Sequence, residues 1–291
     1  MLSEWKLQQV TQDGQTWVYH DSGEGPPVLL FHGFPDTPRS FETIAHALNG
    51  AGFRTITPYL RGYHPDTLVP GRGYDALSVA EDALGLMDAL GLQSASLVGH
   101  DWGATVVYGA TSLAPERIDS IVPIAIAHPK TLKPKNLLQA AGMMVLARHF
   151  IYFQMPWCES GARRNDFAYI DALYSRWSPN WKGPERDAAV ARVKEAFANP
   201  EVLSAAIDWY RAMFAKTDRP LERLRGPLKT RGLMVAGGKD FGGRLGPYKR
   251  SLSLFEEGAE ILVMPEAGHW PHREDEPRFI DALITFLRRD A

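Results

Sequence analysis

The chain has 291 residues, of which 45% are hydrophobic and 23% charged, with a formal net charge of −2. This composition is that of a globular protein, and the length suits a single α/β unit with an insertion. The near-neutral charge argues against binding to nucleic acid or to an anionic membrane. Cys158 is the single cysteine, so no internal disulfide can form, and no Cys/His cluster has zinc-ligand spacing.

The first residues lack the charged and then apolar pattern of a signal peptide, and no apolar run approaches the roughly 20 residues that span a bilayer. We therefore expect a cytoplasmic protein with no membrane partner, either a monomer or a homodimer.

The first half of the chain alternates short apolar segments with amphipathic ones. Strands are predicted at 15–20, 27–31, 54–58, 95–98 and 118–127, a turn at 21–25, and helices at 41–50, 78–90 and 104–110. This alternation predicts a mostly parallel sheet with helices on both faces.

The alternation stops after residue 128 and returns after residue 222. Residues 129–222 are rich in aromatic residues, Met and Arg, and their pattern is helical. Strands predicted at 232–240 and 260–264 complete the sheet, and a helix predicted at 276–289 closes the chain. We predict a core formed by 1–128 and 223–291, with 129–222 as a helical lid over the carboxyl ends of the strands. Open α/β sheets bind their ligands at those ends.

Residues 99–103 read Gly-His-Asp-Trp-Gly between a predicted strand and a predicted helix. Small residues two positions either side of a central residue are typical of a nucleophile elbow, a tight turn that exposes the central side chain. The usual occupant is Ser, but here it is Asp101, which excludes a serine esterase. A carboxylate is ionised at neutral pH and can attack saturated carbon without a base.

Two further candidates follow strands later in the chain. Asp240 is at the polar carboxyl end of the strand predicted at 232–240, just after two glycines, and His269 lies in the loop after the strand at 260–264. The order of nucleophile, acid and histidine is that of the α/β hydrolases. Each residue also has an ordinary interpretation: Asp101 as a helix N-cap, Asp240 as a turn residue and His269 as a packed loop histidine.

Several motifs resemble those of the α/β-hydrolase-fold epoxide hydrolases. They are His32-Gly33-Phe34-Pro35, the elbow, Gly238-Lys239-Asp240-Phe241 and Gly268-His269-Trp270. Within the insertion, residues 150–156 and 207–211 resemble the two family segments that carry the lid tyrosines. The resemblance runs from about residue 5 to the last helix and implies the α/β-hydrolase fold.

The resemblance also implies a reaction and its residues. Asp101 would open a hydrophobic epoxide to an alkyl ester while Tyr152 and Tyr210 polarise and protonate the departing oxygen. His269, oriented by Asp240, would activate water to hydrolyse that ester to a vicinal diol. The backbone N–H groups of Phe34 and Trp102 would form the oxyanion hole, with Pro35 in a cis-proline turn.

No metal and no organic cofactor is needed for this chemistry, and the partners are an epoxide and water. Epoxide hydrolysis would fit a role in detoxification and a role in catabolism equally well. The other histidines are interpreted differently: His32 and His100 as structural, and His149 and His272 as surface or packing residues. The tryptophans of the insertion, such as Trp157 and Trp177, are predicted to pack the lid and line the pocket.

Two other functions stay open. A haloalkane or haloacid dehalogenase uses the same Asp–His–Asp machinery. A haloalkane dehalogenase usually has a polar halide ligand after the His-Gly pair, and Phe34 at that position argues against it. A fluoroacetate-type dehalogenase needs an Arg next to the nucleophile to bind the substrate carboxylate, and Trp102 at that position argues against it. A hydrolase-fold binding protein without turnover is a third interpretation, which the intact nucleophile, acid and base argue against.

Overall fold

A single eight-stranded sheet organises the protein in the computed structural model, which describes residues 5–69, 73–132, 148–216, 218–240 and 245–289. The strand order is β1-β2-β4-β3-β5-β6-β7-β8. The pairs β1–β2 and β2–β4 are antiparallel, and all the pairs from β4–β3 to β7–β8 are parallel. The prediction of a mostly parallel sheet is therefore confirmed.

The strands are β1 Lys6–Gln12, β2 Gln15–Ser22, β3 Pro27–Phe31, β4 Arg54–Pro58, β5 Ala95–His100, β6 Ile118–Ile124, β7 Arg231–Gly237 and β8 Ala259–Met264. The helices are α1 Glu42–Gly50, α2 Ala76–Ala89, α3 Trp102–Leu113, α5 Arg148–Tyr152, α6 Cys158–Trp177, α7 Pro184–Phe197, α8 Pro200–Ala212, α9 Leu245–Ser251, α10 Pro271–Glu274 and α11 Glu276–Leu287.

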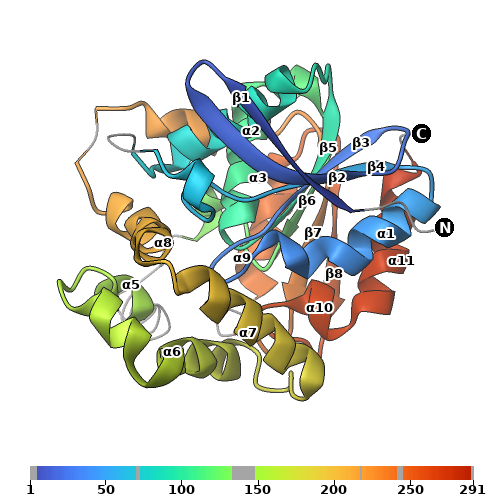
Figure 1. The fold of residues 1–291 in the computed structure, drawn as a ribbon. Helices are drawn as coiled ribbons and strands as arrows, with labels where there is room; N and C mark the ends of the chain where they lie inside the picture. Colours follow the sequence, from blue (N-terminus) through green and yellow to red (C-terminus); the bar gives the residue numbers. More distant parts are fainter. Residues whose placement is uncertain (1–4, 70–72, 133–147, 217, 241–244, 290–291) are drawn as a thin grey trace.

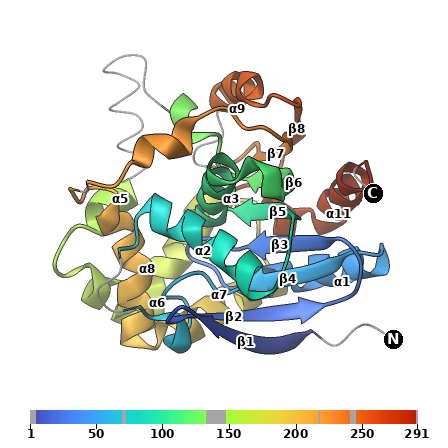
Figure 2. The ribbon, with the colours of Figure 1, turned by 90° about the horizontal axis from the view of Figure 1, so that it is seen from above.

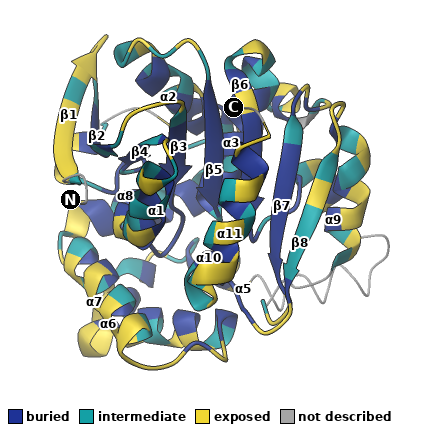
Figure 3. Cartoon of the chain, turned by 90° about the vertical axis from the view of Figure 1, so that its right-hand side faces the viewer, coloured by how far each residue is buried: buried dark blue, intermediate teal, exposed yellow. Residues whose placement is uncertain are grey.

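Both faces of the central strands are buried, because helices cover the sheet on each side. Along β3, Leu29 and Phe31 belong to the apolar cluster that includes α2 and α3, whereas Val28 and Leu30 belong to the cluster that includes α1 and α11. Successive side chains of a strand point to opposite faces, so a strand buried on both faces reads as a continuous apolar run. Figure 3 shows β3, β5 and β7 buried, in contrast to the exposed edge strand β1.

Helices α5 to α8 lie together at one end of the sheet, and we call them the lid helices. Figures 1 and 2 show them on the side away from the two chain ends. Trp209 of α8 donates a hydrogen bond to the carbonyl of Arg61, and Tyr174 of α6 donates one to the carbonyl of Pro35. These bonds tie the lid helices to the loops that follow β4 and β3.

The structure departs from the predicted elements mainly at their ends. Strand β1 and helix α9 were not predicted, β2 continues through Ser22 into the predicted turn, and β6 ends three residues before the predicted end at 127. The predicted lid includes 133–147 and 217, and the fourth motif includes Phe241; these residues lie outside the described part of the chain. Within the described ranges, no helix has both the length and the apolar composition to cross a membrane.

Candidate active site

Asp101 occupies a sharp turn between β5 and α3. Its backbone has φ 53° and ψ −112°, a left-handed conformation that is unusual for a residue with a side chain. Asp101 stands at the N-cap position of α3, but its carboxylate makes no capping bond to the helix. Its Oδ1 instead accepts a hydrogen bond of 2.9 Å from the backbone N–H of Phe34.

The two glycines of the elbow permit the close approach that this turn needs. A Cβ on Gly99 would collide with the carbonyl of Gly103, and one on Gly103 would collide with the carbonyl of Phe31. Only glycine fits at both positions, because α3 packs directly against the strands it follows. The spacing of small residues in the sequence therefore has a steric cause.

The imidazole of His269 lies between two carboxylates. Its Nε2 is 3.4 Å from Asp101 Oδ2, and its Nδ1 is 3.0 Å from Asp240 Oδ2. All three side chains are largely buried. The structure thus brings together the three predicted residues from the ends of β5, β7 and β8.

The charges at this site are strongly coupled. Burial acts to lower the pKa of His269, but the carboxylates of Asp240 and Asp101 outweigh it and raise the pKa to about 10. Burial acts to raise the pKa of Asp101, yet hydrogen bonding and attraction from His269 hold it below its usual value. In the free protein the pair is therefore an imidazolium beside a carboxylate.

The backbone around His269 is held by the lid and by the core. Its N–H donates to the carbonyl of Trp177 at 3.0 Å and to Oγ of Ser178 at 2.9 Å, at the end of α6. Its carbonyl accepts a hydrogen bond of 2.8 Å from Nε2 of His100. The position of the histidine thus depends on the end of a lid helix as well as on its own loop.

Beneath this loop, Asp36, His100 and His272 form a buried group with the residue types of a metal site. Their potential ligand atoms lie within 4.8 Å of one another. Asp36 Oδ2 accepts a hydrogen bond of 3.2 Å from Trp270, and the Nε2 of His100 holds the carbonyl of His269. The bonds present fit a structural role beside His269, and the position of His100 agrees with its interpretation as structural.

The backbone donors expected for an oxyanion lie at the same point. The first donor is the Phe34 N–H, which donates to Asp101. The second is the Trp102 N–H, in the first turn of α3, where helix N–H groups have no intrahelical acceptor. The positive end of the α3 dipole also faces this turn. The Phe34–Pro35 peptide bond is cis, as the resemblance implied.

Tyr210 of α8 reaches the site from the lid. Its ring centroid lies 5.1 Å from that of Phe34 and 5.2 Å from that of Trp102, the two residues whose N–H groups are expected to form the oxyanion hole. Burial raises the pKa of its phenol well above the ordinary value, and the charge of Asp101 raises it further. Tyr210 is therefore a protonated donor near the carboxylate.

Tyr152 does not join this group. Its hydroxyl donates a hydrogen bond of 3.2 Å to the carbonyl of Cys158, and its ring stacks on Tyr169 at 4.5 Å between centroids. Burial and Cys158 raise the pKa of its phenol. The first lid tyrosine implied by the resemblance thus faces the start of α6 rather than the elbow.

His149, one helical turn before Tyr152, occupies the site instead. It is 2% exposed, and its ring lies 5.5 Å from Tyr210 and 4.8 Å from Trp177. Of the two interpretations given for His149 and His272, surface residue or packing residue, the structure agrees with packing, since both side chains are buried. No sequence pattern distinguished His149 from the other histidines.

The aromatic lining is built mainly by the core loop after β3 and the lid. Phe34 packs against Phe153 and Phe197 at 5.2 and 5.8 Å between centroids, and Trp177 packs against His269 at 4.9 Å. Trp157 differs from the prediction, because it is 59% exposed.

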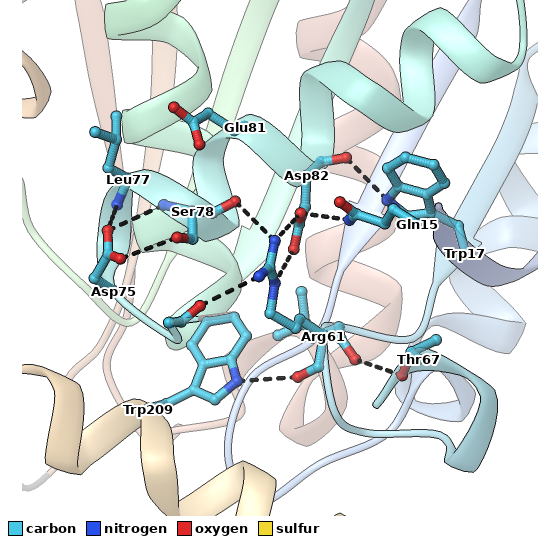
Figure 4. Close-up of polar contacts among 12 residues, drawn as sticks. Gln15, Trp17, Arg61, Thr67, Asp75, Leu77, Ser78, Glu81, Asp82 and Trp209 are labelled. Carbon is cyan, nitrogen blue, oxygen red and sulfur yellow. Dashed lines mark hydrogen bonds and ion pairs between the residues drawn. The ribbon is translucent and has the colours of Figure 1, made fainter. Parts of the chain in front are cut away.

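A buried ion pair supports α8 next to Tyr210. Arg61 binds both carboxylate oxygens of Asp82 on α2 and also donates to the carbonyl of Gly73 (Figure 4). The carbonyl of the same arginine accepts a 3.0 Å bond from the Trp209 indole. The Arg61–Asp82 pair thus holds the loop that accepts the hydrogen bond from Trp209, the residue next to Tyr210 in α8.

Replacing Asp82 with Ala is expected to lower the free energy of unfolding by about 3–5 kcal/mol, because it leaves the Arg61 charge buried without its partner. The side chains of Arg61 and Asp82 are 4% and 13% exposed. The control is Asp88→Ala, whose carboxylate pairs with Arg117 but is 52% exposed, so its expected loss is about 0–1 kcal/mol. Urea unfolding measures both; equal losses would contradict this role of the buried pair.

Comparison with known proteins agrees with this geometry. Residues 26–275 match the model of the alpha/beta hydrolase fold family. The chain is 32% identical over 301 residues to Epoxide hydrolase 2 of Siraitia grosvenorii, covering 92% of this chain and 93% of the relative. The chain belongs to the epoxide hydrolase family of α/β hydrolases.

Two further comparisons are consistent with membership of this family. The AB hydrolase superfamily protein YfhM of Bacillus subtilis (strain 168) is 31% identical over 212 residues, covering 72% of this chain and 73% of the relative. A crystal structure of a candidate epoxide hydrolase from Klebsiella pneumoniae subsp. pneumoniae MGH 78578 has a TM-score of 0.82 at 28% identity and covers 96% of each chain.

Proposed function

We propose that this protein hydrolyses a hydrophobic epoxide to a vicinal diol through an alkyl ester on Asp101. The observation that carries the proposal is the position of His269, 3.4 Å from Asp101 and 3.0 Å from Asp240. A carboxylate can displace a leaving group from saturated carbon, and the ester so formed needs an adjacent base for its hydrolysis. The arrangement supplies both.

In the first half of the reaction, an oxygen of Asp101 attacks a ring carbon. The new C–O bond forms as the oxirane C–O bond breaks, and the electron pair goes to the departing oxygen. Tyr210, buried and protonated, gives its proton to that oxygen. The product is a hydroxyalkyl ester and a tyrosinate.

In the second half, His269 takes a proton from water while the hydroxide attacks the carbonyl carbon of the ester. The N–H groups of Phe34 and Trp102 stabilise the oxyanion. The intermediate collapses to the carboxylate, and the leaving diol oxygen takes the proton from His269. The second proton of the water restores the hydroxyl of Tyr210.

The coupled charges suit this order of events. In the free protein, Asp240 and Asp101 outweigh burial and hold the pKa of His269 at about 10. Esterification neutralises Asp101, so one of the two charges that raise the pKa is lost and the pKa falls. His269 then releases its proton to solvent and is a neutral base at the stage that needs one, and it takes a proton from solvent again once Asp101 regains its charge.

The aromatic lining supports an apolar substrate, either an aryl or an alkyl epoxide. Phe34 packs against Phe153 and against Phe197 beside the elbow, and all three side chains are buried. A lining of this kind favours burial of an apolar group next to a few polar donors.

A dehalogenase is the second candidate, because a halide needs no proton and the indole N–H of Trp102 could bind it. The neighbouring Phe34 offers only a backbone donor, which argues against this function. A panel of styrene-type and aliphatic epoxides, halogenated alkanes and fluoroacetate, scored for diol and halide, tests the proposal. Diol from an epoxide supports it; halide release without diol, or binding without any product, would overturn it.

Removing the hydroxyl of Tyr210 is expected to slow ring opening by about 10²-fold, because the departing alkoxide loses its proton donor. Tyr152→Phe is expected to change the rate less than about threefold, because the Tyr152 hydroxyl donates its hydrogen bond to the Cys158 carbonyl and not to the substrate. Stopped-flow measurement of ester formation compares the two variants. A larger effect at Tyr152 than at Tyr210 would reverse this assignment of the lid donors.

A further inference from the structure

We infer that Glu274 and Ser178 are positioning residues that hold His269 in place as the base of ester hydrolysis, and that the lid takes part in this step through Ser178. The inference rests on the proposed function and concerns its second half. Both side chains act on the backbone around the histidine rather than on the substrate, and neither stood out in the sequence.

The carboxylate of Glu274 binds the backbone on both sides of His269. Its Oε2 accepts a hydrogen bond of 2.8 Å from the N–H of Gly268, and its Oε1 accepts one of 3.1 Å from the N–H of Trp270. Glu274 is the last residue of α10, and its own N–H donates to the carbonyl of Trp270 at 2.9 Å. One side chain thus ties the residues before and after the histidine into a single turn.

Ser178 connects this turn to the lid. It follows directly after α6, is 1% exposed, and its Oγ accepts a hydrogen bond of 2.9 Å from the N–H of His269. The same hydroxyl donates its one proton to Oε1 of Glu274 at 2.5 Å, the length of a charge-assisted bond. The N–H groups of residues 268–270 are therefore held by Glu274 or by the hydroxyl that Glu274 orients.

Close packing presses the His269 turn against the end of α6. A Cβ on Gly268 would lie 2.4 Å from the carbonyl oxygen of Trp177 and 2.6 Å from Oγ of Ser178. The carbonyl of Trp177 also accepts a bond of 3.0 Å from the N–H of His269. Glycine at 268 thus permits the direct contact between the histidine turn and the lid.

The charge of Glu274 interacts with the groups that it holds. Burial raises the pKa of this carboxyl, whereas the three hydrogen bonds that it accepts and the charge of His269 oppose the rise. Hydrogen bonds to an ionised acceptor are stronger than those to a neutral one. A neutral amide at the same position should therefore hold the turn less firmly than the carboxylate does.

The two halves of the reaction place different demands on His269. In the first half, Asp101 attacks carbon and the imidazole transfers no proton. In the second half, Nε2 must reach the attacking water while Nδ1 stays bonded to Asp240. Because a misplacement of about 1 Å can cost about 10²-fold in rate, loss of the backbone anchors should slow ester hydrolysis and spare ester formation.

The test compares the two steps in matched variants. Glu274→Ala and Ser178→Ala remove the anchors, and Glu274→Gln keeps the shape without the charge. The control is Glu276→Ala, whose partly buried carboxylate pairs with Arg273 at 3.3 Å. In single turnovers of styrene oxide, the intact protein is quenched and weighed over time to follow the formation and the loss of the ester. Thermal unfolding of each variant checks the fold.

We expect ester hydrolysis to slow by about 10- to 10²-fold in Glu274→Ala and in Ser178→Ala, with ester formation changed less than about threefold. The loss is partial because His100 still binds the carbonyl of His269. Glu274→Gln should recover part of the lost rate. Glu276→Ala, which leaves the turn intact, should keep both steps within about twofold of the native rates.

Proton NMR follows the hydrogen bond between His269 and Asp240 without any substrate. The signal of the proton at Nδ1 should move in Glu274→Ala and Ser178→Ala and stay in place in Glu276→Ala. Unchanged ester hydrolysis in the folded variants, equal slowing of both steps, or an unmoved signal would overturn the inference. If Glu274→Ala does not fold, Ser178→Ala and Glu274→Gln decide the test.

Failure of the proposed function looks different. The native protein would then give neither ester nor diol from any epoxide, and the NMR signal alone would decide whether Glu274 and Ser178 hold His269 in place.

Discussion

Asp101→Ala is expected to abolish diol formation, with turnover lowered by at least about 10³-fold. The variant lacks the atom that bonds to carbon, and the remaining donors cannot replace a nucleophile. Chromatography of the diol from an epoxide that the native protein hydrolyses gives the measurement. The mass of the intact variant after mixing with substrate should also stay unchanged.

The matched control is Asp208→Ala, in the lid helix α8 just before Trp209. Its carboxylate pairs with Arg211 on the surface and faces no reacting group, so turnover should stay within about twofold of the native value. If Asp101→Ala kept native turnover while remaining folded, Asp101 would not be the nucleophile, and the mechanism would have to be abandoned.

His269→Gln is expected to stop the reaction after its first half. Ester formation needs Asp101 and the lid donor Tyr210, whereas hydrolysis needs the base, so one equivalent of ester should accumulate and steady-state turnover should fall by about 10³-fold or more. Mass spectrometry of the peptide that contains Asp101 should show the mass of one added epoxide.

The control for this variant is His64→Gln, in the loop after β4. His64 is partly exposed and caps a short 3-10 turn through the N–H of Asp66, away from the reacting groups. It should form no lasting adduct and keep native turnover. An inactive His269→Gln variant that carries no adduct would contradict the two-step reaction.

The core triad was predictable because each of its residues has a local signal. Asp101 lies between two glycines that close packing requires. Asp240 follows the buried strand β7 and His269 follows the partly buried strand β8, and the apolar runs of both strands are readable in the sequence. Parallel strands bring their carboxyl ends to one edge, so residues far apart in the chain converge there. The fold and the core of the site therefore followed from local patterns.

The lid side chains that face the elbow could not be predicted in the same way. Helix α5 has only five residues, and its side chains at 149 and 152, three positions apart, lie on the same face of its single turn. Which of the two faces the elbow depends on how α5 packs against α6 and α8, and no periodicity encodes that packing. The resemblance selected Tyr152, whereas tertiary packing turned Tyr152 toward Cys158 and His149 toward Tyr210.

Strand β1 was missed for a different reason. Six of its seven residues are exposed, so it lacks the apolar run or the alternation that marks a buried strand. It forms through backbone pairing with β2 after a two-residue turn at Asp13 and Gly14, both with positive φ. Edge strands of this kind depend on turn geometry more than on burial.

The central claim is that a carboxylate oxygen of Asp101 becomes an oxygen of the diol. A single turnover in oxygen-18 water, with the protein in excess over the epoxide, tests it most directly. The account predicts an unlabelled diol and one labelled oxygen in the peptide that contains Asp101. A diol that carries the label in this first turnover, beside an unlabelled Asp101, would mean direct attack by water and would contradict the account.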